Sequence, residues 1–270
     1  KLAPMSYLES IGFFGAFLTG VIIGLFGGGG SILAVPIFVY LFKLNPVLAT
    51  SYSMFVVGSS AAIGTLINIK KKLIEYKTAL IFTLPALVFV SLTRRFLIPN
   101  IPDTILSFES FAVTKEMGLM LFFSSIIILS SILMMRKPGI GVATKTTTQK
   151  NYSLLIFIGL GVGVLTGLVG AGGGFIIVPA LVLFARLTIK QAVATSLIII
   201  TFNSLIGFSS DVSFLKIEWD FLILFTALSV VGIFVGTYIS SFVREATLKT
   251  NFARFMIVMA AVIIFKELTS

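Results

Sequence analysis

One glycine-rich segment occurs twice in this chain. Residues 24–36 read GLFGGGGSILAVP and residues 167–179 read GLVGAGGGFIIVP, a constant shift of 143 residues (from 24 to 167). Seven of the thirteen paired positions are identical, where unrelated segments would agree at about one. The chain is therefore an internal duplication. Because each glycine run lies between two apolar segments, each half is predicted to contain a broken helix or a hairpin with a glycine tip.

Apolar runs of membrane-spanning length recur from end to end. The 270 residues are 57% hydrophobic and 11% charged, with a mean hydropathy of +1.12, whereas soluble domains carry roughly 25% charged residues. A helix of about 20 apolar residues spans a bilayer. The runs are apolar on all sides and do not alternate with polar residues, which favours helices over a membrane barrel. The sequence thus predicts an all-α polytopic membrane protein.

The charged residues bear on orientation, and the missing residue types exclude several chemistries. The net charge is +10, but the Lys and Arg residues lie in short loops between apolar segments, so they indicate topology and not a nucleic-acid partner. The chain has no Cys and no His, which excludes disulfides, zinc sites and His-based catalysis. No buried nucleophile and base pair is apparent. We expect a non-enzyme in contact with membrane lipids, without cofactor or metal.

Each half contributes five apolar segments. In the first half these are residues 7–26, 31–42, 49–69, 78–92 and 118–135. The second half has one segment ending at its glycine run, then residues 174–185, 194–210, 221–243 and 252–265. The segment after each glycine run is only about 18 Å long as a helix, too short to cross a hydrocarbon core of about 30 Å. The predicted division is an N-terminal repeat (1–135), a cytoplasmic linker (136–151) and a C-terminal repeat (152–270).

Loop charges predict that the two repeats have inverted topology. Two copies of an odd number of segments must face opposite ways, and the loops agree. Loop 70–77 has four Lys and one Glu, whereas its counterpart 211–220 has three acidic residues and one Lys. Loop 100–117 is acidic and its counterpart 244–249 is basic. By the positive-inside rule we expect both termini to be external. The first glycine tip is then expected to enter from the cytoplasmic side or to lie near it, and the second tip to do so from the outside.

The predicted interior offers hydrogen-bond donors but no carboxylate. All ten acidic residues fall in loops or at segment ends, so a carboxylate proton relay is not expected. Glycine runs followed by helix starts near Ser31 and Gly174 supply converging N–H groups, which bind anions. Transporters with inverted repeats place substrate between broken helices of this kind. The predicted binding residues are Gly27, Gly28, Gly29, Gly30, Ser31, Thr50, Ser51, Gly170, Gly172, Gly173, Gly174, Thr195, Ser196 and Asn203.

Each of these features also has a simpler interpretation. A glycine run can serve close helix packing alone, and Thr or Ser hydroxyls can bond to carbonyls of their own helix. Asn203 either links helices or lines the path. Arg94 and Arg95 are interpreted as snorkelling anchors or as an outer anion funnel. Replacing Gly29 or Gly172 with Val is expected to abolish transport, and to strain the backbone if the native residue has positive φ.

The doubled pattern G-x-x-G-x-G-G-x-x-x-x-V-P, followed in both halves by Ala-Thr-Ser, resembles the sulfite exporter TauE/SafE family over essentially the whole chain. Ala171 and Ser31 depart from the symmetry. The resemblance implies transport of sulfite, sulfoacetate or other organosulfonates across a bacterial or archaeal inner membrane. Our interpretation is a secondary transporter with alternating access. A passive anion channel and a non-catalytic scaffold are the alternatives, and coupling to a proton or Na⁺ and a homodimer are left open.

Overall fold

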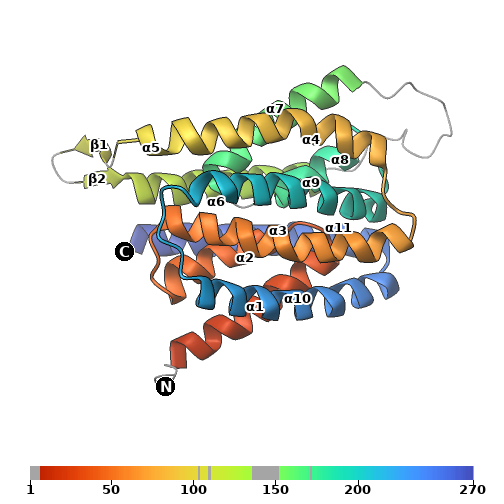
Figure 1. Ribbon diagram of the computed structural model, residues 1–270, viewed down its shortest axis with the longest axis horizontal. Helices are drawn as coiled ribbons and strands as arrows, with labels where there is room; N and C mark the ends of the chain where they lie inside the picture. Colours follow the sequence, from red (N-terminus) through yellow and green to blue (C-terminus); the bar gives the residue numbers. More distant parts are fainter. Residues whose placement is uncertain (1–6, 103, 109–110, 136–151, 171, 270) are drawn as a thin grey trace.

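The protein is an elongated helical bundle (Figure 1), for which a computed structural model describes the backbone of residues 7–102, 104–108, 111–135, 152–170 and 172–269. The predicted linker 136–151 and Ala171 lie outside the described residues. The elements are α1 (Tyr7–Phe26), α2 (Gly30–Pro36), the π-helix η1 (Ile37–Leu41), α3 (Pro46–Lys70), α4 (Tyr76–Leu92), the π-helix η2 (Thr93–Leu97), α5 (Ile98–Asn100), β1 (Thr104–Phe108), β2 (Phe111–Thr114), α6 (Lys115–Met135), α7 (Tyr152–Val169), α8 (Gly174–Leu183), α9 (Ile189–Asp211), α10 (Trp219–Phe242) and α11 (Glu245–Thr269).

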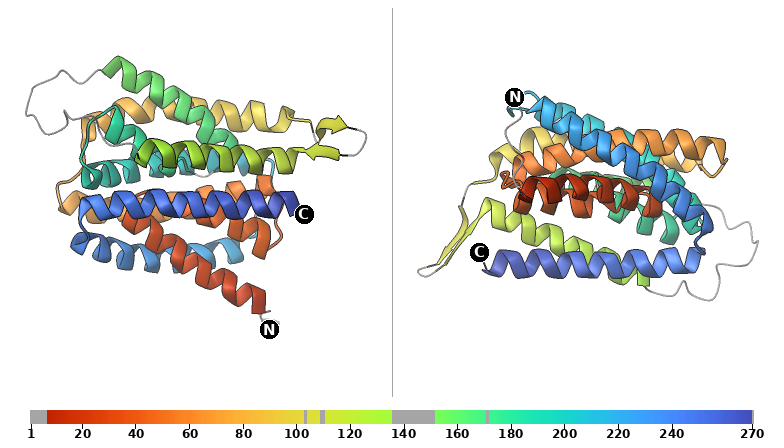
Figure 2. Two further views of the ribbon diagram at one scale, coloured as in Figure 1. Left: turned by 180° about the vertical axis from the view of Figure 1, so that it is seen from behind. Right: turned by 90° about the horizontal axis from the view of Figure 1, so that it is seen from below.

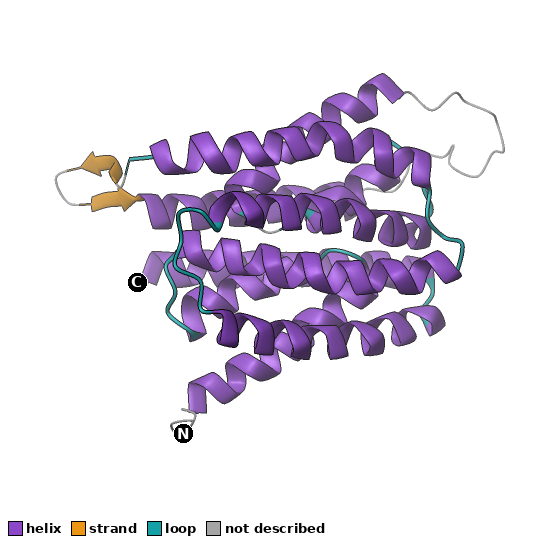
Figure 3. Ribbon diagram, viewed as in Figure 1, coloured by secondary structure: helices purple, strands orange, loops and turns teal. Residues whose placement is uncertain are grey.

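Within the described part of the chain, seven helices are long and apolar enough to cross a membrane. They are α3, α4 with its continuation to Asn100, α6, α7, α9, α10 and α11. Shorter apolar helices cover Ile11–Phe26, Gly30–Leu41 and Gly174–Leu183. The strands β1 and β2 form a small antiparallel hairpin at one end of the bundle (Figure 3). The prediction of a helical polytopic membrane protein is confirmed, with this hairpin as an addition inside the predicted loop 100–117.

Local sequence signals set several helix starts. Asn45 caps α3 by accepting the backbone N–H of Val47 at 2.8 Å, and Pro46 occupies the first turn, where its missing N–H costs nothing. Thr188 and Gln191 form a capping box at the start of α9. The start of the last segment was predicted wrongly. The expected loop 244–249 is mostly helix, because α11 already begins at Glu245.

The two glycine runs do break helices. α1 ends at Phe26 and the chain turns back as α2 and η1, and α7 ends at Val169 and the chain turns back as α8. In Figure 1 the first hairpin begins and ends at the face where both termini lie, and the second begins and ends at the opposite face. Gly24 and Leu25, which precede the first tip, line a cavity with Lys71 of the loop between α3 and α4. The first hairpin enters from the face of the termini and not from the face of loop 70–77, so the expectation that it enters from the side of that loop is wrong.

Small residues allow the helices to approach closely. α1 packs on α10 and α7 packs on α4, while α3 and α9 pair in the centre. α6 and α11 pair on the side that faces the viewer in the left view of Figure 2. A Cβ on Gly20 would overlap the Ser229 carbonyl oxygen of α10. A Cβ on Gly163 would lie 2.6 Å from the Ala86 oxygen of α4. The regularly spaced small residues therefore serve close packing.

Candidate functional site

The two glycine tips meet inside the bundle. A Cβ added to Gly28 would overlap the Cα of Gly174, and a Cβ added to Gly174 would overlap the Cα of Gly28. Backbone therefore lies directly on backbone, which is possible only because both residues lack side chains. The structure thus brings together two of the predicted residues that are 146 positions apart, Gly28 and Gly174.

The first tip is a single tight turn in which the carbonyl oxygens of Gly27 and Gly28 accept side-chain hydrogen bonds. Gly27 has φ +76°, and its carbonyl oxygen accepts a hydrogen bond from the Ser196 hydroxyl at 3.3 Å. The same hydroxyl also donates to Val193 O at 2.8 Å. Ser31 donates to Gly28 O at 3.4 Å. The condition of a positive φ is not met at Gly29, because its φ is −71° where the chain already turns into α2 at Gly30.

The second tip has a different backbone. Gly170, Gly172 and Gly173 have φ values of +65°, +62° and +69°, so three of its residues occupy the left-handed region that favours glycine. The condition of a positive φ is met at Gly172. α8 begins at Gly174 and is ten residues long. The chain therefore makes a wider loop here before the second half of the hairpin starts.

An ion pair that sequence reasoning missed lies beside the second tip. Arg94 Nη1 lies 2.9 Å from Asp211 Oδ2, and the two residues are only 2% and 6% exposed. Arg94 is therefore not a snorkelling anchor or part of an outer funnel, which corrects the expectation. Asp211 also corrects the expected absence of an interior carboxylate. The physical reason is that η2 carries the helix past residue 92, so Arg94 lies within the bundle while Arg95, next to it, is exposed.

The second tip lies directly against this guanidinium. A Cβ at Gly170 would overlap Arg94 Nη2 and Thr50 Cβ. Arg94 Nε and Nη2 make no hydrogen bond with any described residue. Ser51 Oγ lies near the Asp211 carboxylate but also lacks a hydrogen bond of ordinary geometry. Because unpaired buried donors are costly, this concentration of them marks the most unusual polar site among the described residues.

Further hydroxyls around the second tip are also unpaired. Thr166 Oγ1 lies beside Gly173, and Ser204 Oγ lies beside Gly172. Neither hydroxyl has a partner among the described residues. The second tip is thus surrounded by neutral donors in addition to one cation.

The remaining predicted residues differ in their availability. Thr195 Oγ1 accepts the backbone N–H of Glu75 at 3.1 Å, so it braces the loop between α3 and α4. Thr50 donates to Val47 O of its own helix at 2.9 Å. Asn203 is fully buried, and neither atom of its amide has a partner among the described residues. It therefore makes no interhelical hydrogen bond that would explain it as a link between helices.

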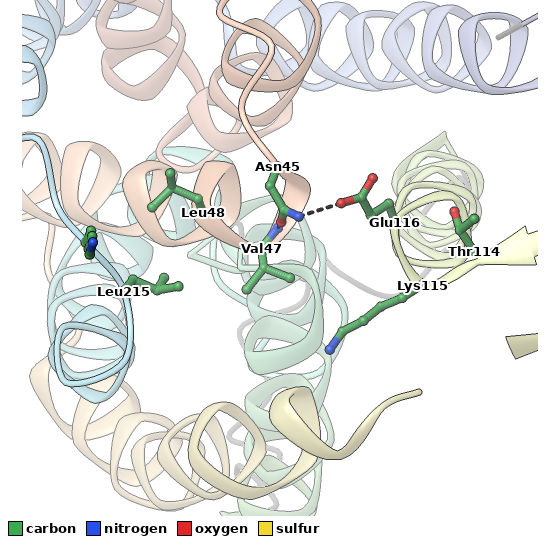
Figure 4. Close-up of a pocket in the computed structure, with 8 residues that line it drawn as sticks. Asn45, Val47, Leu48, Thr114, Lys115, Glu116 and Leu215 are labelled. Carbon is green, nitrogen blue, oxygen red and sulfur yellow. Dashed lines mark hydrogen bonds between the residues drawn. The ribbon is translucent and has the colours of Figure 1, made fainter. Parts of the chain in front are cut away.

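Several cavities open at the surface of the described residues, and two of them, at opposite faces of the bundle, are lined by lysines at equivalent positions of the two repeats. The larger of these two, about 640 Å³, lies at the face of the termini (Figure 4). In it Asn45 donates a hydrogen bond to Glu116, and Lys115 donates to Ile98 O at 2.7 Å. The smaller, about 280 Å³, lies at the other end of the bundle. The larger is lined by Asn45, Val47, Leu48, Thr114, Lys115, Glu116, Leu215 and Lys216, and the smaller by Gly24, Leu25, Asn68, Lys71, Leu73, Lys190, Val193, Ser240, Ser241 and Leu248.

A signal for the ion pair was present in the sequence. Arg94 and Asp211 stand at the ends of two apolar segments that were predicted to finish at the same face, and they carry opposite charges. The sequence gave no such signal that Thr166, Thr50 and Ser204 would lie together, because only the fold brings their helices to the second tip.

These features define a class: a helical multi-pass membrane protein whose two interrupted hairpins meet at glycine tips and surround a polar interior. The chain belongs to the sulfite exporter TauE/SafE family, whose profile matches residues 12–263. The predicted resemblance is confirmed, and the family supports a membrane transporter.

Curated relatives have names of the same kind. The chain is 30% identical over 199 residues to a probable membrane transporter protein of Methanocaldococcus jannaschii, covering 72% of this chain and 68% of the relative. It is 27% identical over 231 residues to a probable membrane transporter protein of Xylella fastidiosa, covering 83% and 82%. The probable membrane transporter protein YunE of Bacillus subtilis is 28% identical over 217 residues, covering 75% and 77%. No solved structure matches the chain.

Proposed function

We propose that the protein is a secondary transporter that moves small sulfur-containing anions, such as sulfite, sulfoacetate or another organosulfonate, across the inner membrane by alternating access. The observation that carries this proposal is the contact between Gly28 and Gly174. Two re-entrant hairpins approach from opposite faces and touch at their tips, so that a movement of either tip would open a space for a substrate beside the other. Transporters with inverted repeats use the same arrangement.

The packing of the helices supports two inverted repeats. If each helix is replaced by its counterpart in the other repeat, the contact between α1 and α10 becomes the contact between α7 and α4. In the same way, the contact between α3 and α10 becomes the contact between α9 and α4. The pairs α2 with α8, α3 with α9 and α6 with α11 are converted into themselves. A reciprocal set of contacts of this kind is what an axis lying in the membrane plane between the halves would produce.

The two cavities supply entrances that obey the same exchange. Lys71 of the smaller cavity and Lys216 of the larger one are repeat counterparts, each in the loop after the third segment of its half. Asn45 and Lys190 are also counterparts, because each stands four positions before the Ala-Thr-Ser triplet of its half. Exposed cations at the mouth of a cavity raise the local concentration of anions. We infer that the cavities are the two mouths of one path.

The contact at the tips favours a transporter over a passive channel. A channel needs a continuous opening, but here backbone packs on backbone at Gly28 and Gly174. Passage then requires the tips to move for each substrate. Reconstitution in liposomes tests this distinction: we expect labelled sulfite to enter faster when unlabelled sulfite is present on the other side. A voltage-driven current without such exchange would favour the channel instead.

The inverted topology has its own test, because the chain contains no Cys. Single cysteines introduced at Lys71 and at Ser213, both exposed, should react with a membrane-impermeant maleimide from opposite faces. A cysteine at Arg244 is the matched control and should react from the same face as that at Lys71. Labelling of Lys71→Cys and Ser213→Cys from one face would contradict the inverted repeats.

A further inference from the structure

We propose that Arg94 is the cationic anchor for the transported oxyanion, which it holds through its Nε and Nη2 edge while Asp211 fixes its Nη1. This inference rests on the proposed function, since it names the residue at which that anion binds. It also replaces the expectation of a site made only from neutral donors.

The nitrogens of the Arg94 guanidinium fall into two sets, one paired and one unpaired. Nη1 is occupied by the Asp211 carboxylate at 2.9 Å. The two nitrogens without a partner among the described residues, Nε and Nη2, lie together on one edge of the planar group. That edge presents two parallel N–H bonds, which fit two oxygens of a single sulfonate, sulfite or carboxylate. The unpaired donors are thus the pair that bidentate oxyanion recognition requires.

A purely structural role does not account for the buried and unpaired nitrogens of Arg94. The Arg94 side chain has no exposed surface, so bulk solvent does not reach its remaining donors. A buried ion pair gains little unless its other hydrogen-bonding groups are also satisfied, and here they are not. Charged residues within membrane spans are costly and usually mark substrate paths. An anion would satisfy both free donors and is therefore the missing partner.

The surroundings connect this edge to the moving part of the fold. Gly170 lies against Nη2, so the second tip covers the edge in this conformation. The unpaired hydroxyl of Ser51 lies on the neighbouring helix and can donate to a third oxygen. Asp211 balances the cation when no anion is bound, which keeps the empty site near neutrality. Displacing the tip from Arg94 would expose the edge together with these donors.

A binding experiment with a charge-matched pair of probes tests the inference. Methanesulfonate is the anion and dimethyl sulfone its neutral analogue of similar shape. In the purified full-length protein we expect methanesulfonate, but not the sulfone, to raise the Tm with concentration. Arg94→Lys retains the charge but loses the two-nitrogen edge, so its apparent Kd should rise roughly ten- to a hundredfold.

Two further variants keep the test interpretable. Arg94→Gln/Asp211→Asn removes both charges together, so no lone buried charge remains to unfold the protein, and it should not respond to methanesulfonate. Arg95→Gln is the matched control, because Arg95 is adjacent and exposed, and it should respond as the parent does. If Arg94→Lys and the double variant bind methanesulfonate like the parent, the inference is overturned.

Transport assays separate this result from the proposed function. If the parent and the double variant both exchange sulfite, the proposed function stands and the assignment to Arg94 fails. If the parent neither exchanges sulfite nor responds to any oxyanion, the proposed function itself fails.

Discussion

The two glycine tips share a sequence pattern but differ in what surrounds them. At the first, the Ser196 hydroxyl is paired with Gly27 O, and one residue has positive φ. At the second, three glycines have positive φ and Gly170 lies against a buried guanidinium with unpaired donors. Duplication preserved the glycine pattern, while the backbone of the tip and the neighbouring helices diverged. We propose from this comparison that the first tip closes the path and the second holds the ligand.

Adding one methyl group to the second tip should have the largest effect. Gly170→Ala places a Cβ where Arg94 Nη2 and Thr50 Cβ lie, at a φ of +65° that costs a non-glycine residue about 1–2 kcal/mol before any clash. We expect sulfite exchange to be lost and the Tm to fall. Gly161→Ala is the control on the same hairpin: nothing lies within 4 Å of its Cβ. It should stabilise the protein by about 0.5–1 kcal/mol. Exchange at the parent rate by Gly170→Ala would remove the second tip from the mechanism.

The repeat counterparts Ser51 and Ser196 sharpen the comparison. Both are fully buried, but the Ser51 hydroxyl is unpaired and the Ser196 hydroxyl is not. Ser51→Ala should therefore weaken methanesulfonate binding by about 1–3 kcal/mol, or roughly five- to a hundredfold, with little change in Tm. Ser196→Ala should lose about 1 kcal/mol of stability and keep its affinity. The opposite outcome, with binding lost only in Ser196→Ala, would move the ligand to the first tip.

The smallest effect is expected at Thr195. Its hydroxyl accepts the Glu75 N–H, so Thr195→Val should lower the free energy of unfolding by about 1 kcal/mol and leave anion affinity unchanged. Ser124→Ala is a suitable control, since Ser124 donates only to Leu121 O of its own helix among the described residues. A thermal melt with and without methanesulfonate measures both quantities. A large loss of affinity in Thr195→Val would restore it to the binding residues.

Helices and turns were predictable from the sequence because their causes are local. The glycine run ends α1 at Phe26, as predicted, since no apolar side chains continue the helix there. The segment predicted to end at residue 92 instead continues to Asn100, because an apolar run resumes after Arg94 and Arg95. The ion pair with Asp211 joins residues 117 positions apart. Such a pairing depends on how α4 and α9 pack. The opposite charges at one predicted face are compatible with it, but no local pattern selects these two residues.

The contact between Gly28 and Gly174 has a mechanical consequence. Two elements that touch without side chains between them have no compressible layer to absorb a displacement, so a push on one is transmitted to the other. If one tip retracts, the space that it leaves is the space into which its neighbour can advance. Retraction on one side and sealing on the other then become a single movement. The protein would prevent leakage of other solutes by this mutual exclusion, without needing a separate gate residue.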